Sequence, residues 1–324
     1  MTERVTVLYI GGHGRSGSTI LTQTLGQIPG FVNVGELWQV WHRGLQENEC
    51  CGCGRRFYSC EFWTAVGDEA YGGWDNVDVD KMAAFRPYLK GLRHTPHYAL
   101  AANTGIRTRK MNTLLEECGP VLERLYRAIQ TVSGAGVIVD SSKRSSYAQL
   151  LNLLPFADLR VVHLVRDSRA VAYSWQRTKE SPAVVGGRLM PRLSPAKASR
   201  RWSLQNYSYG LLSRFAHLTR LRYEDFVNDP TFYIAETLLR AGFAGEAGSL
   251  HEVVHGREIS LSVDHTVSGN PSRFRTGKIE LRLDEEWKGK MRGADKNVVT
   301  VLTAPLLLNY GYLGTRETSK WYRH

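Results

Sequence analysis

The stretch "VTVLYIGGHGRSGSTILTQTL", residues 5–25, decides the fold. It opens with an apolar, β-branched run at residues 5–10, which is typical of a buried parallel strand. A glycine-rich loop follows at once, and from Ser16 apolar side chains recur at helical spacing until the chain reaches Gly26 and Pro29. Strand, glycine-rich loop and helix in this order predict a βα unit that binds an anion at the helix N-terminus.

The loop itself carries the groups that an anion needs. Gly11, Gly12 and Gly14 permit positive backbone angles and a close approach of backbone amides to a ligand. Arg15 adds a fixed, bidentate cation. Three hydroxyl side chains add hydrogen-bond donors, those of Ser16, Ser18 and Thr19. A purely structural glycine-rich turn is the alternative interpretation.

The loop lacks the lysine that nucleoside triphosphatases carry. The residue after Gly17 is Ser18, so the ATP-binding pattern G-x-x-x-x-G-K-S/T is not met. Magnesium-dependent phosphoryl transfer loses support for this reason.

Further strands and helices alternate along the chain. We expect strands at residues 31–34, at "GVIVDSSK" (136–143), within "LRVVHLV" (159–165) and near Leu221, with helices between them, one over residues 114–129. This order predicts a single α/β domain over residues 1–324 with a doubly wound parallel β-sheet, a P-loop-like anion loop and helices on both faces. Residues 50–112 show no strand alternation, and we interpret them as a helical and loop insertion that covers the active site.

A second anion site is predicted from "LVRDSRAVAYSW", residues 164–175. Arg166 ends a strand, and Asp167 with Ser168 start a helix on which Ser174 falls within the first two turns. Two separate anion sites on one sheet suggest a ligand with phosphates at both ends. The alternative is a surface ion pair between Arg166 and Asp167 beside an ordinary helix cap.

The composition of the chain narrows the classes of ligand and partner that it could bind. The net charge of +11 and a pI near 9.5 favour anionic ligands. The basic residues are dispersed, and no nucleic-acid-binding signature appears, so a polyanionic small molecule fits better than nucleic acid. No apolar run is long enough to span a membrane and no signal peptide is recognisable, so we expect a cytoplasmic protein without a transmembrane segment.

Four of the five cysteines lie in "CCGCGRRFYSC", residues 50–60. In a cytoplasmic chain such a cluster suggests metal or reduced thiols before disulfides. Paired C-x-x-C knuckles are missing from Cys50, Cys51, Cys53 and Cys60, so packing thiols or an occasional disulfide are favoured over structural zinc.

"GRSGST" (14–19) and "VRDSRAVAYS" (165–174) together resemble the two cofactor motifs of sulfotransferases that use 3'-phosphoadenosine-5'-phosphosulfate (PAPS). The arginine in the first motif resembles that of carbohydrate-type and bacterial members. By this resemblance the 5'-phosphosulfate would be held by Arg15, Ser16, Gly17, Ser18 and Thr19, and the 3'-phosphate by Arg166 and Ser174.

Two later segments extend the likeness. "LRYEDFVNDP" (221–230) is similar to a recurrent segment of the family, and "HTVSGNPSRFRTGKIEL" (265–281) is similar to its late cofactor-closing loop. There the resemblance places Arg273, Gly277 and Lys278 at the 3'-phosphate, and His265, just before the loop, is a candidate for orienting it.

Sulfuryl transfer needs cations for the charge that grows on oxygen and a base for the acceptor hydroxyl, but no metal. Arg15 supplies one cation and Lys143, just past a strand end, another, with Ser141 and Ser142 placed to orient it or to touch the acceptor. Glu36 is the first choice of base, because Trp38 and Trp41 lie close by in sequence and would raise its pKa by desolvation. His42, followed by His94 and His97 in the insertion, are the alternatives.

We therefore expect an enzyme that transfers a sulfuryl group from PAPS, leaving 3',5'-adenosine bisphosphate (PAP), to a hydroxyl of a glycan, glycolipid or natural-product acceptor. The alternative is an ATP-dependent small-molecule kinase of P-loop type. A basic adaptor that binds nucleic acid is a third, non-enzymatic reading.

Overall fold

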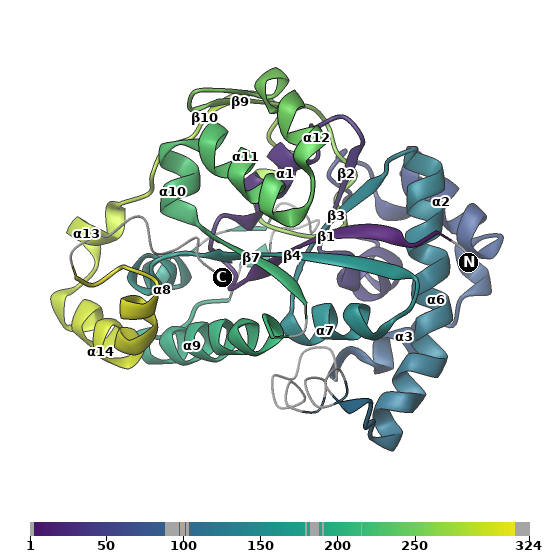
Figure 1. Ribbon diagram of the computed structural model, residues 1–324, viewed down its shortest axis with the longest axis horizontal. Coiled ribbons are helices and arrows are strands. Elements are labelled where there is room, and N and C mark those ends of the chain that lie inside the picture. The colour runs from purple at the N-terminus through teal and green to yellow at the C-terminus, as the bar shows by residue number, and fades with distance from the viewer. Residues whose placement is uncertain are drawn as a thin grey trace.

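The computed structural model of the chain describes residues 3–87, 97, 101, 104–178, 180–181, 188–189, 191–214 and 216–314. His94, one of the expected bases, lies outside them. A five-stranded sheet of order β2-β3-β1-β4-β7 forms the centre of the molecule, and each neighbouring pair is parallel (Figure 1). Its strands are β1 (Val5–Gly12), β2 (Phe31–Gly35), β3 (Val137–Lys143), β4 (Ala157–Val165) and β7 (His217–Arg222).

Helices cover both faces of this sheet, as the sequence predicts (Figure 1). Along β1, Leu8 and Ile10 pack into the apolar cluster on one face, while Val7 and Tyr9 pack into the cluster on the other. One face is covered by α1 (Ser18–Leu25), α10 (Tyr223–Asn228) and α11 (Pro230–Ala241), and the opposite face by α6 (Arg109–Ser133), α7 (Ser145–Leu153) and α9 (Pro195–Leu212). The predicted doubly wound α/β fold is confirmed.

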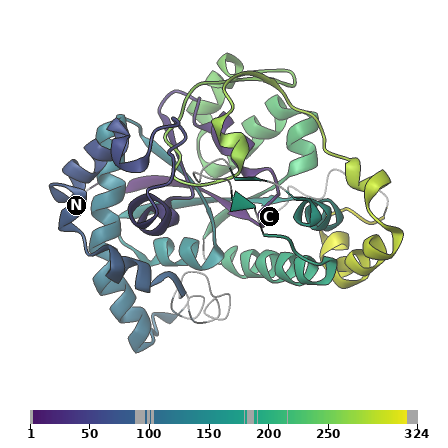
Figure 2. The same cartoon turned by 180° about the vertical axis from the view of Figure 1, so that it is seen from behind.

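Beyond the ends of β4 and β7 the chain forms a smaller helical group. Here α8 (Ser168–Gln176) packs against α9 and against α14 (Gly293–Asn309), with α13 (Glu286–Lys290) beside it (Figures 1 and 2). A small antiparallel sheet has the order β10 (Gly277–Glu280), β9 (Glu258–Leu261) and β8 (Val254–His255). Strands β5 (Glu180–Ser181) and β6 (Arg188–Leu189) form a two-stranded ribbon.

In the described part of the chain, the other helices with assigned bounds are α2 (Glu61–Tyr71), α3 (Val79–Ala84), α12 (Ala244–Ala247), the π-helix η2 (Val40–Gln46) and the 3-10 turns η1 (Leu37–Gln39), η3 (Phe57–Ser59), η4 (Trp74–Asn76), η6 (Gly248–Glu252) and η7 (Pro271–Phe274). No helix in the described part of the chain is long and apolar enough to cross a membrane.

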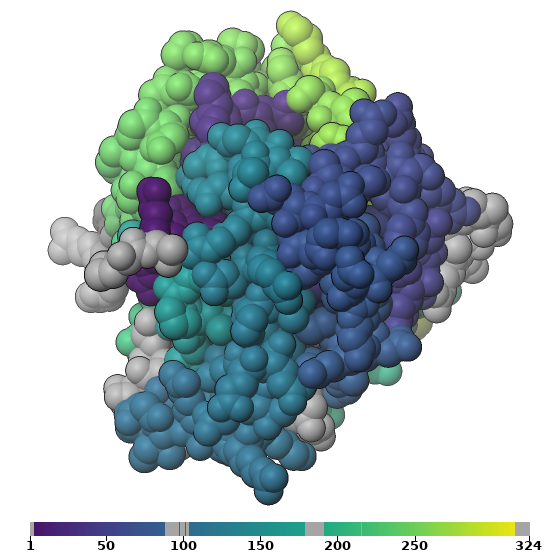
Figure 3. Space-filling model, turned by 90° about the vertical axis from the view of Figure 1, so that its right-hand side faces the viewer, coloured from purple at the N-terminus to yellow at the C-terminus, as the bar shows by residue number. Residues whose placement is uncertain are grey.

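The described part of the 50–112 insertion extends the hydrophobic core with buried side chains of its own. Phe57 stacks on Trp63 with ring centroids 5.3 Å apart and lies 5.6 Å from Trp74, and all three side chains are buried. Helix α2 packs on α6, so the segment thickens one end of the molecule, where its blue surface adjoins the teal α6 in Figure 3. Burial of three aromatic rings gives this segment a stabilising role of its own.

Candidate active site

A cavity of about 630 Å³ lies where β1 to β4 end. Its walls carry four cationic side chains, Arg15, Lys143, Arg166 and Arg275, against two carboxylates, Glu36 and Asp284. The other lining residues are Gly14, Gly17, Ser18, Thr19, Ile20, Ser174, Trp175, Tyr223, Gly269, Asn270, Pro271 and Ser272. The position is the one expected for ligands of a parallel α/β sheet, and its excess of cations favours an anion.

The glycine-rich loop forms one wall through its backbone. Gly17 is the N-cap of α1 with φ 87°, and no side chain caps this helix end. A Cβ atom at Gly17 would lie 2.3 Å from the ring of Tyr223, so both the backbone angle and the space require glycine. The helix N-terminus is therefore open toward the cavity, which suits an anion.

Arg15 itself has a left-handed backbone, φ 73°, and its guanidinium lies 5.1 Å from the ring centroid of Trp175. Burial lowers the pKa of Arg15 from its ordinary value. Two buried polar atoms near this point, Ser16 Oγ and Trp175 Nε1, have no hydrogen-bond partner among the described residues. The Ser16 side chain is buried and does not line the cavity, while Trp175 does.

Arg166 lies almost fully buried between the loop and residue 284. Its Nη1 donates to the carbonyl of Arg15 at 3.1 Å, and its Nη2 lies 3.2 Å both from the carbonyl and from Oδ2 of Asp284. The guanidinium also stacks over Tyr223 at 4.5 Å. Its Nε is buried and has no acceptor among the described residues, which leaves one charged donor available to a ligand.

The surface ion pair that we considered between Arg166 and Asp167 is not formed. Asp167 instead caps α8, accepting from the backbone N–H of Arg169 at 2.8 Å, and pairs with the Arg169 guanidinium at 2.6 Å. Ser174 lines the cavity from the same helix. The structure thus brings Arg15, Arg166 and Ser174 to one cavity.

The two residues expected to act in transfer meet at the end of the sheet. Lys143 Nζ lies 2.6 Å from Glu36 Oε1, and both side chains are mostly buried. The register pairs Lys143 with Gly11, next to the anion loop. Lys143 has φ 60°, an angle that non-glycine residues rarely adopt, so the surrounding structure holds it there against its backbone preference.

The pKa of Glu36 differs from the expectation. Burial alone would raise it, but the Lys143 ammonium, with Arg144 and Arg273 farther away, outweighs burial and leaves the pKa below its usual value. Desolvation acts on Glu36 in the direction that we expected, but the neighbouring cations, Lys143 above all, reverse its effect on the pKa. Trp38 and Trp41 pack into the core, and neither lines the cavity. Glu36 is therefore a charged, paired carboxylate.

A buried polar cluster ties the ends of β2 and β3 together. Asp140 Oδ1 accepts from the N–H of Ser142 at 2.7 Å and from its hydroxyl at 2.5 Å, and Ser142 Oγ accepts from the N–H of Trp38 at 3.0 Å. Tyr126 donates to Asp140 Oδ2 at 2.7 Å. Burial raises the pKa of Asp140 to about 6. Ser142, next to Lys143 in the chain, thus links Asp140 to the backbone of Trp38. It does not line the cavity.

The late loop closes the cavity, but not with the residues that the sequence suggests. Asn270 N–H lies 3.4 Å from Thr19 Oγ1, which docks the loop on α1. Arg273 points into the protein, where its Nη2 donates to the carbonyl of Cys50 at 2.5 Å, and Arg275 lines the cavity in its place. Gly277 and Lys278 belong to β10, where Lys278 pairs with Glu258 at 3.0 Å, and neither lines the cavity.

The histidine alternatives also lie elsewhere. His42 is on η2, with Nδ1 3.1 Å from Gln46 Oε1 and Nε2 3.5 Å from Glu47, and it does not line the cavity. His97 is exposed and is likewise absent from the walls. No described residue of the 50–112 insertion lines the cavity, and the expected cover over the active site stays a prediction.

Sequence reasoning missed the four charged or aromatic lining residues Trp175, Tyr223, Arg275 and Asp284. The first three lie within motifs quoted above, and Trp175 and Arg275 are one and two positions from the chosen residues Ser174 and Arg273. No sequence pattern distinguished Asp284 from other surface acids.

Comparison with known proteins agrees with this architecture. The solved sulfotransferase domain from the Synechococcus PCC 7002 olefin synthase is 18% identical, with 97% of this chain and 98% of that one covered and a TM-score of 0.50. A sulfotransferase domain from the curacin biosynthetic pathway is 16% identical over 94% and 98% of the two chains, with a TM-score of 0.49. No curated protein sequence gives a significant match.

The family assignment rests on the sequence. The family model described as the sulfotransferase family matches residues 8–240, which include the anion loop, Glu36, Lys143 and the Arg166 segment. This match covers well over half of the chain. The chain therefore belongs to the sulfotransferase family.

Proposed function

We propose that the enzyme transfers a sulfuryl group from PAPS to a hydroxyl of a glycan, glycolipid or natural-product acceptor. One observation carries the proposal: Arg15 and Arg166, from two separate strand ends, line the same cavity as the Glu36–Lys143 pair. Family membership supports sulfuryl transfer in general.

The cavity residues fit an adenosine nucleotide with phosphates at both ends. The open N-terminus of α1, with Arg15, Gly17, Ser18 and Thr19, would hold the 5'-phosphosulfate. Arg166 and Ser174 would hold the 3'-phosphate, and the unpaired buried donors Arg166 Nε and Trp175 Nε1 are suited to phosphate oxygens. When bound, PAPS supplies the activated sulfuryl group.

The Glu36–Lys143 pair would act on the acceptor side. Glu36 is charged, and its Oε1 is held by Lys143, so we assign the proton of the acceptor hydroxyl to Glu36 Oε2. Lys143 supplies a second cation near the anion loop, where it stabilises charge that grows on oxygen during transfer. Neither role requires a metal ion.

Thermal unfolding with nucleotides tests this proposal. A ligand that binds only the folded state stabilises it by about 2.7 kcal/mol at 100 times its dissociation constant, which raises Tm by several degrees. We expect PAP to raise Tm in magnesium-free buffer, and ATP with magnesium to have a much smaller effect.

Two outcomes would overturn the assignment. A Tm rise with ATP that depends on magnesium, together with none for PAP, would indicate the kinase alternative. Stabilisation by DNA or RNA that survives Arg15→Ala and Arg166→Ala would indicate the nucleic-acid adaptor.

A further inference from the structure

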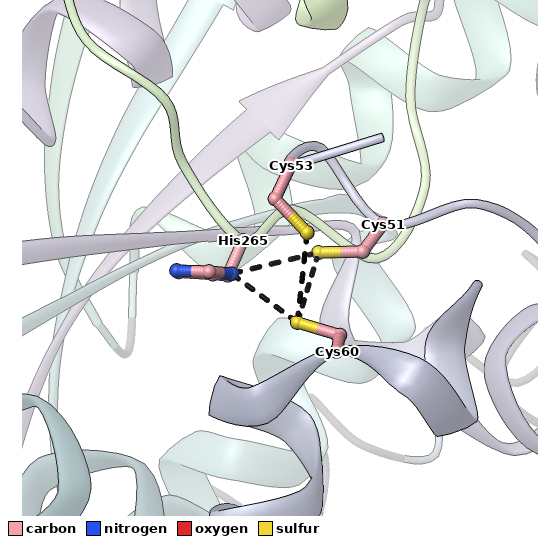
Figure 4. A group of neighbouring side chains, drawn as sticks. All are labelled: Cys51, Cys53, Cys60 and His265. Carbon is pink, nitrogen blue, oxygen red and sulfur yellow. Dashed lines mark hydrogen bonds between the residues drawn. The ribbon is translucent and has the colours of Figure 1, made fainter. Parts of the chain in front are cut away.

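Three cysteines and one histidine converge away from the cavity (Figure 4). Cys51, Cys53 and Cys60 come from the insertion, and His265 comes from the segment that precedes the late loop. One potential ligand atom of each, three Sγ atoms and the imidazole nitrogen, lies within 4.8 Å of all the others. In Figure 4 the sulfur atoms point toward one another and toward the imidazole nitrogen.

Four of the six distances within this group are close to those of a tetrahedral site. Zinc bound to sulfur at about 2.3 Å and to nitrogen at about 2.1 Å places two sulfur ligands about 3.8 Å apart, and a sulfur and a nitrogen about 3.6 Å apart. The Sγ of Cys60 lies 3.6 Å from that of Cys51 and 3.7 Å from that of Cys53. His265 Nδ1 lies 3.3 Å from Cys60 Sγ and 3.8 Å from Cys51 Sγ.

We propose that Cys51, Cys53, Cys60 and His265 bind a structural zinc ion. Four protein ligands fill a tetrahedral zinc site, so no position stays open for a substrate or water. None of the four lines the cavity, so the ion takes no part in the reaction. The inference is independent of the sulfuryl donor proposed above.

The cysteine loop is shaped for this arrangement. Cys51 and Cys60 are fully buried, and Cys51 forms a tight turn in which its N–H donates to the carbonyl of Arg55 at 2.8 Å and its carbonyl accepts from the N–H of Gly54 at 2.9 Å. Cys60 is the N-cap of α2, where the helix dipole favours a thiolate. Three thiolates gathered at this point would require a cation to balance their charge.

His265 is held at the opposite side by packing and by a hydrogen bond. Its ring stacks on Phe62 with the centroids 4.9 Å apart, and its carbonyl accepts from Trp63 Nε1 at 2.8 Å. The neighbouring Thr266 carbonyl accepts from the N–H of Gly52 at 2.9 Å. The imidazole orientation is therefore fixed by the chain and not by the thiols alone, as expected for a preorganised ligand.

The two alternatives raised by the sequence fit less well. A disulfide joins two sulfur atoms and leaves a third thiol and the imidazole unexplained, and all five cysteines are free thiols in this structure. Plain packing would not require three sulfurs and a ring nitrogen to face one point. Paired C-x-x-C knuckles are missing because the fourth ligand, His265, lies 205 residues beyond Cys60.

Such an ion would join the insertion to the wall of the cavity. His265 lies four residues before Gly269, the first lining residue of the late loop, and Arg273 of the same loop binds the carbonyl of Cys50. The ion would thus fix the base of the loop that places Asn270 and Arg275. We expect its removal to loosen residues 264–275.

Metal analysis of the purified wild-type chain tests the proposal. Protein produced in zinc-supplemented medium and purified without chelator is expected to carry about one zinc per chain by inductively coupled plasma mass spectrometry. Exchange with cobalt is expected to give the sulfur-to-cobalt charge-transfer absorption and intense visible bands of a tetrahedral thiolate site. Wild-type protein that carries a small fraction of one zinc and no cobalt spectrum would overturn it.

Matched variants locate the site. Cys60→Ser and His265→Ala are expected to lose at least about ten-fold in zinc affinity, whereas Cys50→Ser, at a neighbouring cysteine outside the cluster, keeps one zinc. His265→Cys retains a complete ligand set and is expected to keep the metal, which separates loss of a ligand from misfolding. Equal metal loss in Cys50→Ser and Cys60→Ser would contradict this assignment.

Discussion

Replacing Arg166 by alanine tests the second phosphate site most sharply. The side chain is buried, contacts the Arg15 carbonyl and Asp284, and has one charged donor, Nε, without an acceptor among the residues that the structure describes. A hydrogen bond to a charged group contributes about 1.5–3 kcal/mol, so loss of one or two phosphate contacts costs about 3 kcal/mol. That corresponds to roughly a 100-fold rise in the dissociation constant of PAP.

Isothermal titration calorimetry in magnesium-free buffer measures this change. The matched control is Arg177→Ala. Arg177 directly follows α8, the helix that begins just after Arg166, and it pairs with Glu286 at 3.2 Å and does not line the cavity. We expect the control to bind PAP as the wild type does. An Arg166→Ala protein that also binds within about three-fold of wild type would refute the reasoning.

Replacing Asp284 tests the same phosphate site, with an expected effect on PAP affinity opposite to that of Arg166→Ala. Its carboxylate lies 3.2 Å from Arg166 Nη2, so it competes with an incoming phosphate for the same cation. Asp284→Asn removes that charge, and we expect PAP to bind more tightly. Weaker binding would show that the carboxylate positions Arg166 rather than competes for it.

Three further changes probe the loop, the buried acid and the transfer pair. Gly17→Ala places a Cβ atom 2.3 Å from an aromatic ring at φ 87°, whereas Gly30→Ala meets open space at φ 83°. Backbone strain alone costs about 1–2 kcal/mol, so chemical denaturation should show a larger loss of unfolding free energy for Gly17→Ala than for Gly30→Ala. Equal losses in the two variants would contradict the clash. The pKa of Asp140 is raised from 3.8 to about 6, so the folded state binds the proton of this carboxyl more tightly than the unfolded state does. The resulting stabilisation of the folded state, up to about 3 kcal/mol, is complete below about pH 4 and is lost as the pH rises through about 6. Asp140→Asn should remove this part of the pH dependence of the unfolding free energy. If the variant keeps the wild-type dependence on pH, Asp140 is not its source. Lys143→Met removes the strongest of the charges that oppose the effect of burial on Glu36, so carbon NMR titration should show the pKa of Glu36 rising. No rise would mean that Lys143 does not hold this pKa down.

The sequence predicts the sheet and the anion loop because both depend on local pattern. Apolar β-branched runs mark the strands, and glycines at a strand-to-helix turn mark the loop, whatever the rest of the chain does. The convergence of Arg15, Arg166 and Lys143 also follows, since the carboxyl ends of parallel strands meet at one edge.

Other features depend on distant contacts that no local pattern encodes. Arg273 and Arg275 are two residues apart, and the short turn Pro271–Phe274 sends one into the protein and the other to the cavity. Burial alone would raise the pKa of Glu36, and the direction of the shift is reversed chiefly by Lys143, 107 residues away in the sequence. In the same way, His265 reaches the cysteines only through the path of the folded chain.

Hydrogen exchange with and without PAP tests the central claim most directly, because it shows which backbone segments a nucleotide orders. If one nucleotide spans the cavity, its binding should slow exchange together in residues 11–20, 163–176 and 269–275. Protection of the first segment without the second, or of neither, would contradict the account.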